Sequence, residues 1–403
     1  MTRLGSAPTR RDMLVTGGSL FAWAHAPRFA HAAGGRDPRF VTIILRGALD
    51  GLSAVAPVGD PDYAALRDAI ALSASGDTPA PMLDGFFALH PAMPNLARLY
   101  KAGQALVVHA TATNYRERSH FDGQDVLESG QPRPGLLQSG WLNRALAALP
   151  AGETIDRRGA VGVGATSPLV IRGPAPVLGW SPEGLQRADE ATARRVLELY
   201  AHRDPTLGMA LQRGLQADEI ATGMGAAGKP RGGDPMKRAT DGAAALMARP
   251  DGPRVAALAF GGWDTHANEG GATGPLARLL GQFDTALVSF EQALGPVWKD
   301  TVILAVTEFG RTARINGTTG TDHGTATVAF LLGGAVKGGR VVADWPGLKE
   351  AQLYEKRDLK PTTDLRAVMK GILADHFGLS AAVLRDKVFP GTENVAPMKG
   401  LIA

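Results

Sequence analysis

The sequence predicts an α/β protein, a three-layer α/β/α sandwich around a mostly parallel sheet. Apolar, β-prone runs alternate with stretches whose apolar residues recur at helical spacing, which is typical of a parallel sheet covered on both faces. At least four of these runs are followed within a few residues by acidic, His or Ser groups. Ligands of open α/β sheets bind outside the carboxyl ends of the strands, so these groups predict one convergent polar site.

The first 32 residues predict a twin-arginine signal peptide rather than a part of the fold. Arg10 and Arg11 form the arginine pair, a mildly apolar stretch runs from Leu14 to Ala26, and residues 30–32 have the A-x-A pattern of a cleavage site. The alternative is a disordered cytoplasmic tail with a chance arginine pair. We expect export through the twin-arginine translocation machinery, and hence a periplasmic or secreted protein.

The remaining chain, residues 33–403, is expected to form a single domain. The whole chain has a formal net charge of +4, and removal of the four arginines and one aspartate of residues 1–32 leaves +1. We therefore expect no nucleic-acid partner. The chain has no Cys, which excludes disulfides, Cys-zinc sites and thiol catalysis. No later apolar run is long enough to span a bilayer, so we expect no transmembrane segment in the mature chain.

The elements expected in the first half form strand–helix units. The strands are predicted at 41–45 and 105–109, and the helices at 91–103, 119–130 and 140–149. Residues 160–180 contain three short strand-like pieces separated by Gly and Pro, which predict a small β excursion. With the following residues they would form a cap-like β and helical excursion near 155–250.

The second half returns to the alternating pattern. Residues 183–249 are rich in Ala, Leu and Arg and predict helices, interrupted by a Gly-rich loop at 223–233. The elements expected after them are strands at 254–260, 301–306 and 327–332 and helices at 274–295 and 363–377. Asp364 near the start and Gly378 after the end are typical boundaries of that last helix.

Two Asp/His pairs indicate a metal site. Asp264 and His266 follow a strand and two glycines, and side chains at i and i+2 share a face of extended backbone. Asp322 and His323 lie in a loop rich in Gly and Thr. Each pair alone fits an ordinary loop, but the two together favour a divalent metal. Oxygen and imidazole ligands without thiolate suit zinc, manganese, iron, calcium or magnesium.

Further candidates follow other strands. Asp50 is either a metal ligand or part of an Asp-Gly turn. Glu308 and Arg311 are either a ligand and an anion clamp or an ion pair at a strand end. Ser119 opens a predicted helix, where it is either a nucleophile activated by a metal or an N-cap, and Arg118 adds positive charge for an anion.

The two histidines near the second predicted strand have different interpretations. His109 lies within an apolar run and reads as a core residue. His120 is adjacent to the candidate nucleophile, and the pattern leaves its role open.

These motifs together resemble domain-of-unknown-function family 1501. The resemblance rests on residues 109–130, Gly261-Gly-Trp-Asp-Thr-His266, Thr307-Glu-Phe-Gly-Arg-Thr312 and Gly320-Thr-Asp-His-Gly324. It covers nearly the whole chain after the signal and implies a fold similar to the alkaline phosphatase and sulfatase superfamily. Activity is largely unassigned in this family.

The superfamily resemblance implies roles for individual residues. Asp50 corresponds to the metal carboxylate after the first strand, and Ser119 to the nucleophile. Asp264 and His266 correspond to the carboxylate and imidazole of one metal site, and His323 to its later histidine. Glu308 stands where the superfamily has Asp followed by His. Here Phe309 follows, and Asp264 and His266 are closer in sequence than usual, so one metal or none is implied rather than two.

Two functions remain open. One is an exported metal-dependent hydrolase of an anionic phosphate or sulfate ester, in which Arg118 or Arg311 holds the anion. The other is a binding or assembly protein that retains the fold without turnover. The two Asp/His pairs favour the first, and Glu308 followed by Phe309 favours the second.

Overall fold

The structure is a computed structural model that describes residues 36–149, 159–182 and 234–403, with 196–197, 200, 208–209 and 211–212. The predicted signal peptide, the predicted loop at 223–233 and most of the helices expected from 183 onward lie outside these residues. Residues Pro38–Ala403 form one compact unit. Among the described residues, no helix combines the length and apolar character needed to cross a membrane.

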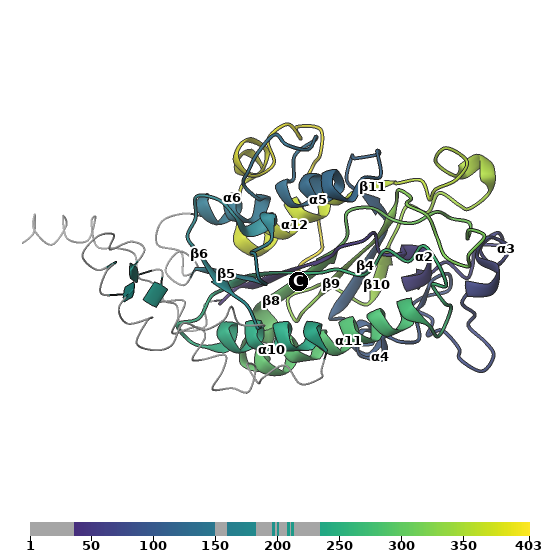
Figure 1. The fold of residues 1–403 in the computed structure, drawn as a ribbon, viewed down its shortest axis with the longest axis horizontal. Coiled ribbons are helices and arrows are strands. Elements are labelled where there is room, and N and C mark those ends of the chain that lie inside the picture. Colours follow the sequence, from purple (N-terminus) through teal and green to yellow (C-terminus); the bar gives the residue numbers. More distant parts are fainter. Residues whose placement is uncertain are drawn as a thin grey trace, which may run out of the picture. The chain divides into compact units, whose positions relative to one another are not determined.

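A nine-stranded sheet forms the middle layer of this unit (Figure 1). The strand order is β10-β4-β9-β8-β1-β7-β5-β6, and β11 pairs with the end of β4. Neighbouring strands run parallel except at β9, which is antiparallel to both β4 and β8. The strands are β1 (Arg39–Leu45), β4 (Ala105–Ala112), β5 (Ala160–Val163), β6 (Val177–Trp180), β7 (Val255–Phe260), β8 (Thr301–Val306), β9 (Thr327–Leu332), β10 (Arg340–Val342) and β11 (Thr363–Asp364).

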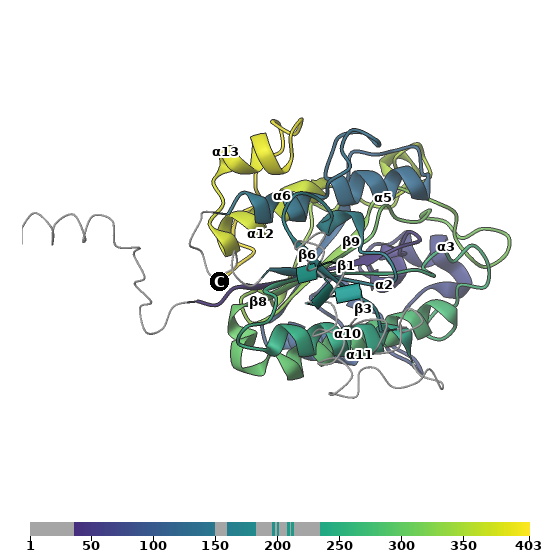
Figure 2. The ribbon, with the colours of Figure 1, turned by 60° about the vertical axis from the view of Figure 1, so that its left-hand side comes forward.

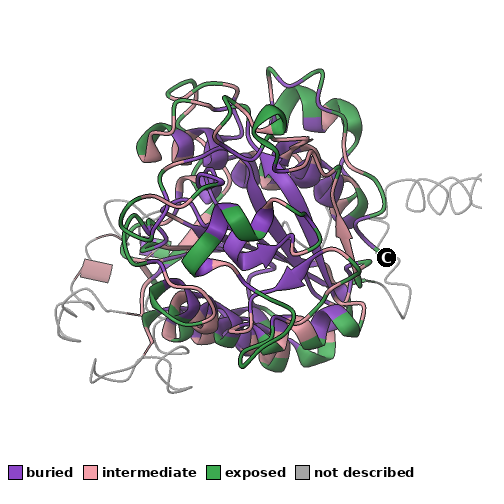
Figure 3. Cartoon of the chain, turned by 90° about the vertical axis from the view of Figure 1, so that its right-hand side faces the viewer, coloured by how far each residue is buried: buried purple, intermediate pink, exposed green. Residues whose placement is uncertain are grey.

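Helices cover both faces of the sheet (Figures 1 and 2). One layer contains α4 (Pro94–Lys101), α10 (Pro235–Ala248) and α11 (Pro275–Ala293), and the other contains α5 (His120–Ser129), α6 (Trp141–Ala147) and α12 (Leu365–Phe377). Strand side chains alternate between the two layers, because successive Cβ atoms point to opposite faces. In β1, Val41 and Ile43 join the core with α10 and α11, whereas Phe40 and Ile44 join the core with α6 and α12. The sheet between them is buried (Figure 3). The predicted three-layer α/β/α sandwich is therefore confirmed.

Shorter elements lie in the connections. They are α2 (Gly51–Ala54), α3 (Tyr63–Arg67), α13 (Ala381–Val383), a two-stranded sheet of β2 (Val55–Ala56) and β3 (Ala88–Leu89), 3-10 turns at Asp68–Ile70, Leu169–Ile171, Gly295–Asp300 and Glu350–Gln352, and a π turn at Leu384–Val388. The predicted ends of two longer helices are also confirmed. Gly130 ends α5 and Gly378 ends α12 in the left-handed conformation, and Asp364 caps α12 by accepting from the Arg366 N–H.

Residues 160–180 differ from the sequence prediction of a cap. β5 pairs in parallel with β7, from Ala160 beside Val255 to Val163 beside Leu258, and β6 pairs in parallel with β5. All four residues of β5 are buried, because the helix layers extend over them. These pieces are the edge of the main sheet, and much of the rest of the predicted excursion lies outside the described residues.

The direction of β9 decides which loops meet. The loops after β1, β4, β7 and β8 share one edge of the sheet, because these strands are parallel. Since β9 is antiparallel, the residues that precede it reach the same edge. The segment containing His323 therefore lies among loops that follow the other strands, although it comes before its own strand.

Candidate metal site

Four side chains converge at this edge, and Asp264 is at their centre. Its Oδ1 atom lies 3.0 Å from His266 Nε2 and 3.2 Å from His323 Nε2, and these two nitrogen atoms are 3.0 Å apart. Two ligands on one ion with bonds of about 2.0–2.1 Å lie roughly 3.3 Å apart when the geometry is tetrahedral. The spacing of the three atoms is therefore close to that of ligands to a single ion.

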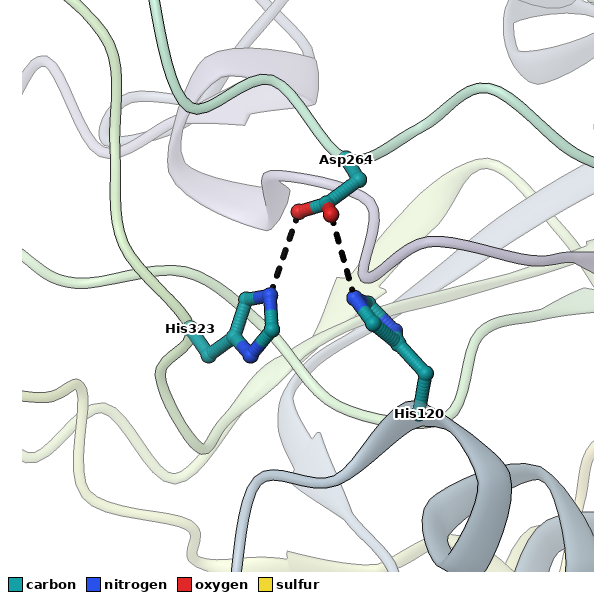
Figure 4. Close-up of side chains that lie close together, drawn as sticks. All are labelled: His120, Asp264 and His323. Atoms are coloured by element: carbon teal, nitrogen blue, oxygen red, sulfur yellow. Dashed lines mark hydrogen bonds and ion pairs between the residues drawn. The ribbon is translucent and has the colours of Figure 1, made fainter.

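His120 approaches the same carboxylate from the start of α5 (Figure 4). Its Nε2 atom is 3.3 Å from Asp264 Oδ2, and ligand atoms of His120, Asp264 and His323 all lie within 4.8 Å of one another. The Nε2 atom of His120 is buried, and among the described residues its polar contact is this approach to Asp264, which does not have the geometry of a hydrogen bond. A buried imidazole nitrogen that lacks a well-formed hydrogen bond and faces a carboxylate and other imidazoles is suited to bind a metal ion.

The opposite nitrogen of His120 is held in place. His120 Nδ1 lies 2.8 Å from Glu308 Oε1, and a carboxylate can only accept, so Nδ1 carries the hydrogen. This leaves the lone pair on Nε2. Metal-binding histidines commonly donate their other N–H to a carboxylate or carbonyl in this way.

The other two imidazoles are oriented by the same principle. His323 Nδ1 donates to the Arg118 carbonyl at 2.9 Å. His266 Nδ1 faces Asp322 Oδ1 at 3.4 Å. In each ring Nε2 is the atom that faces Asp264, so all three histidines present the same nitrogen to the cluster.

Glycines and one buried aromatic ring position Asp264. Gly262 has a φ of 101°, which lets the chain turn after β7, and Trp263 is fully buried with its ring edge-on to Phe283. Gly47 also has a positive φ, and a Cβ atom there would lie 2.7 Å from Asp264 N. The loops after β1 and β7 therefore pack backbone against backbone, which only glycine permits.

Arg118 and Arg311, predicted as anion clamps, are committed to internal contacts. The Arg118 guanidinium pairs with Asp358 at 2.8 Å and with Glu355, while its backbone has a φ of 58° that directs its carbonyl to His323. The fully buried Arg311 side chain donates to Asp264 and to Thr321. Both arginines therefore make contacts within the protein at the candidate cluster, and their predicted contact with an anion stays a prediction.

Glu308 and Asp322 orient imidazoles in the structure, whereas the sequence predicted them as metal ligands. Glu308 Oε1 accepts from Gly47 N at 2.8 Å and Gln124 Nε2 at 3.1 Å as well as from His120. Its Oε2 atom accepts from the Thr307 hydroxyl at 2.9 Å, so protein donors occupy both oxygens. Phe309 is buried and stacks on the His120 ring at 5.1 Å between centroids. Among the described residues at this edge, one group of side chains, that of His120, Asp264 and His323, could hold a metal ion.

Asp50 does not join the cluster. It is the N-cap of α2, where Oδ1 accepts from Leu52 N at 2.9 Å and Ser53 N at 3.2 Å, and Oδ2 pairs with the buried Arg67. Burial alone would raise the pKa of Asp50, but the adjacent Arg67 charge holds it below its usual range. The carboxylate is a structural ion-pair partner, because its oxygens are already satisfied away from Asp264.

Ser119 lies at the N-cap position of α5, directly before His120. Its side chain makes no capping hydrogen bond, so simple N-capping does not describe it. Its backbone N–H donates to the Tyr115 hydroxyl at 3.2 Å. The role of Ser119 as a nucleophile stays a prediction.

Hydrogen bonds, burial and neighbouring charges shift the pKa values of three groups in the cluster. The hydrogen bond to Glu308 raises the pKa of His120, and burial lowers the pKa of His323. Burial would raise the pKa of Asp264, but the Arg311 hydrogen bond and charge keep it below its usual range. The Asp264 side chain is 39% exposed and that of His266 is 47% exposed, so a ligand from solvent can reach them.

The sequence pattern left the role of His120 open, and the structure places this residue in the candidate metal cluster. The sequence feature that could have identified His120 is its position after the second predicted strand, at the same edge of the sheet as the other candidate ligands. Its partner Glu308 is 188 residues away, which no local pattern encodes. His109, by contrast, is a core residue as predicted. Burial lowers its pKa to about 4, and its Nε2 donates to the Val55 carbonyl.

The family of the chain follows from a match over most of its length. The family described as "Protein of unknown function (DUF1501)" matches residues 37–388. The chain belongs to DUF1501. A comparison of this DUF1501 sequence with curated proteins found no match.

Solved structures similar to this DUF1501 chain are distant from it. A phosphonate monoester hydrolase of Agrobacterium radiobacter shares 12% identity over 85% of this chain and 74% of that one, with a TM-score of 0.36. A Pseudoalteromonas sulfatase, PsFucS1, shares 12% over 83% and 68%, with a TM-score of 0.31. Murine ectonucleotide pyrophosphatase/phosphodiesterase 5 shares 10% over 68% of this chain, with a TM-score of 0.28. The DUF1501 chain spans 57% of the length of that murine chain.

Proposed function

We propose that this protein is an exported hydrolase of anionic phosphate or sulfate esters that depends on one divalent metal ion. The observation that carries the proposal is the convergence of three imidazole Nε2 atoms on Asp264, each with its Nδ1 atom held by a carboxylate or a carbonyl. His120, His266 and His323 would hold the ion with Asp264. This donor set favours zinc or manganese over calcium and magnesium, which prefer oxygen ligands alone.

The chain supplies the other parts of such a reaction at the same edge. A bound cation would polarise the ester and lower the pKa of the Ser119 hydroxyl or of a water molecule. Ser119 precedes the ten-residue helix α5, and the unpaired N–H groups of a helix start favour an anion. Arg357 donates to the His323 carbonyl while 41% of its side chain stays exposed, so we assign the anion contact to Arg357.

One prediction tests the nucleophile. Ser119→Ala is expected to retain the metal of the wild type and to lose any activity on p-nitrophenyl phosphate, bis-p-nitrophenyl phosphate or p-nitrophenyl sulfate that proceeds through a covalent intermediate. The measurement pairs elemental analysis with turnover of protein reconstituted with zinc or manganese. Ser129→Ala, at the other end of α5, is the matched control. Unchanged turnover in Ser119→Ala would assign the nucleophile to water instead.

A binding or assembly protein without turnover is the second candidate. It is favoured by the ion pairs that occupy Arg118 and Arg311, and by the four protein donors, which would close a tetrahedral zinc site. A wild-type protein that binds metal stoichiometrically, yet turns over none of the three esters, would support this second function.

Export is the remaining part of the proposal, and it rests on Arg10 and Arg11 followed by the A-x-A pattern at residues 30–32. Replacing both arginines with lysine is expected to leave an uncleaved precursor in the cytoplasm. Cell fractionation with immunodetection measures the outcome. Normal processing of this variant in the periplasm would contradict the twin-arginine route.

A further inference from the structure

Glu269 is a fully buried carboxylate to which the sequence pattern assigned no role. Its Oε2 atom accepts hydrogen bonds from two threonine hydroxyls, Thr265 at 2.9 Å and Thr321 at 2.7 Å. Thr265 lies between Asp264 and His266 in the loop after β7. Thr321 lies two residues before His323 in the loop that precedes β9. One carboxylate oxygen therefore joins the two loops that carry most of the metal ligands.

A series of hydrogen bonds connects Glu269 with Asp264 at the centre of the cluster. Arg311 Nε donates to Thr321 Oγ1 at 3.0 Å, so the hydroxyl hydrogen of Thr321 is left for Glu269. Arg311 also donates to Asp264 Oδ1. The backbone adds a direct link, because Thr321 N donates to the Thr265 carbonyl at 3.1 Å. Glu269 is thus connected to Asp264 through Thr321 and Arg311.

The other oxygen of Glu269 is anchored in the protein interior. Oε1 accepts from Ser53 Oγ at 2.9 Å and lies 3.6 Å from Arg67 Nη2, which also pairs with Asp50. Burial, with the charge of Asp50, raises the pKa of Glu269 to about 8. A neutral Glu269 would carry its proton on Oε1, because Oε2 already accepts two hydrogen bonds.

We propose that Glu269 is a positioning residue of the metal centre, and that its hydrogen bonds with Thr265 and Thr321 set the spacing between His266 and His323. The proposal rests on the proposed metal function. The two ligand loops follow β7 and precede β9, and no covalent constraint sets their separation. A metal site requires ligand distances within about 0.2 Å, so a network that ties the loops together determines affinity.

The first test measures metal affinity. Thr265→Val and Thr321→Val are each expected to weaken zinc or manganese binding by at least about tenfold, because changes in groups that orient ligands typically cost 10–100-fold. Glu269→Gln, which keeps an acceptor toward both threonines, is expected to retain most of the affinity, and Glu269→Leu to lose it. Thr240→Val is the matched control, since its buried hydroxyl bonds within α10. Affinities come from competition with a chelator.

The double variant separates positioning from general destabilisation. Both threonines act through one carboxylate oxygen, so the losses in Thr265→Val/Thr321→Val are expected to be non-additive. Fully additive losses, or an equal loss in Thr240→Val, would overturn the proposal.

The second test needs no metal. Native-state exchange of the amide at residue 321, which donates to the Thr265 carbonyl, is expected to quicken at least about tenfold in Glu269→Leu and Thr265→Val, with the β8 amides unchanged. Unchanged exchange at residue 321 would refute the positioning role. A wild type that binds no metal, with fast exchange in these variants, would instead refute the proposed function alone.

Discussion

His266→Ala is expected to lower bound zinc or manganese by at least about 10–100-fold, because it removes a ligand rather than a group that orients one. His266 is the appropriate ligand to replace, since nearly half of its side chain is exposed and its loss should change stability little. The measurement is elemental analysis after dialysis, together with chelator competition. His202→Ala is the control, because no strand-end argument places that histidine at the site.

The same centre predicts a dependence on pH. The hydrogen bond to Glu308 raises the pKa of His120, which favours the imidazolium form. In that form Nε2 also carries a proton, and a cation must displace it. Metal affinity is therefore expected to fall as the pH falls.

For the His266→Ala variant, a metal content equal to that of the wild type at neutral pH would contradict the proposed ligand set.

Asp50→Asn is expected to lower the free energy of unfolding by about 3 kcal/mol, because loss of one partner leaves a buried charge on Arg67. Buried pairs broken in this way typically cost about 3–5 kcal/mol, and the lower end applies because Glu269, 3.6 Å from Arg67, can ionise in its place. Urea unfolding measures the change. Bound metal should be retained, since Asp50 holds Arg67 rather than an ion.

A surface pair provides the control for Asp50→Asn. Arg98 pairs with Glu291 while 51% of its side chain is exposed, so Arg98→Gln should cost less than about 1 kcal/mol. A loss of metal from Asp50→Asn without a loss of stability would instead assign Asp50 the ligand role implied by the superfamily resemblance.

Local sequence patterns were sufficient for most of the fold. The apolar runs of β1, β4, β7, β8 and β9, the glycine that ends α5 and the caps of α12 are local features. Periodicity and capping chemistry involve residues a few positions apart. The placement of Asp264, His266 and His323 at one edge also follows from local reasoning, since polar residues after parallel strands share that edge.

Tertiary structure decided which polar groups meet and what each one does. Whether a strand-end carboxylate faces a metal or another side chain depends on partners distant in the sequence. Glu308 orients His120 across 188 residues, and Arg311 reaches Asp264 across 47 residues. No sequence pattern indicated a role for Glu269, which lies 52 residues from its hydrogen-bond partner Thr321.

The sequence by itself determined the α/β class, the edge of the sheet where the polar residues gather and three of the four proposed ligands. Only the tertiary structure added His120, gave Asp50 and the arginines structural partners, and placed β5 and β6 in the main sheet. The physical reason is that periodicity records how each segment is buried. The pairing of buried charges is set by packing between segments, which no single segment contains.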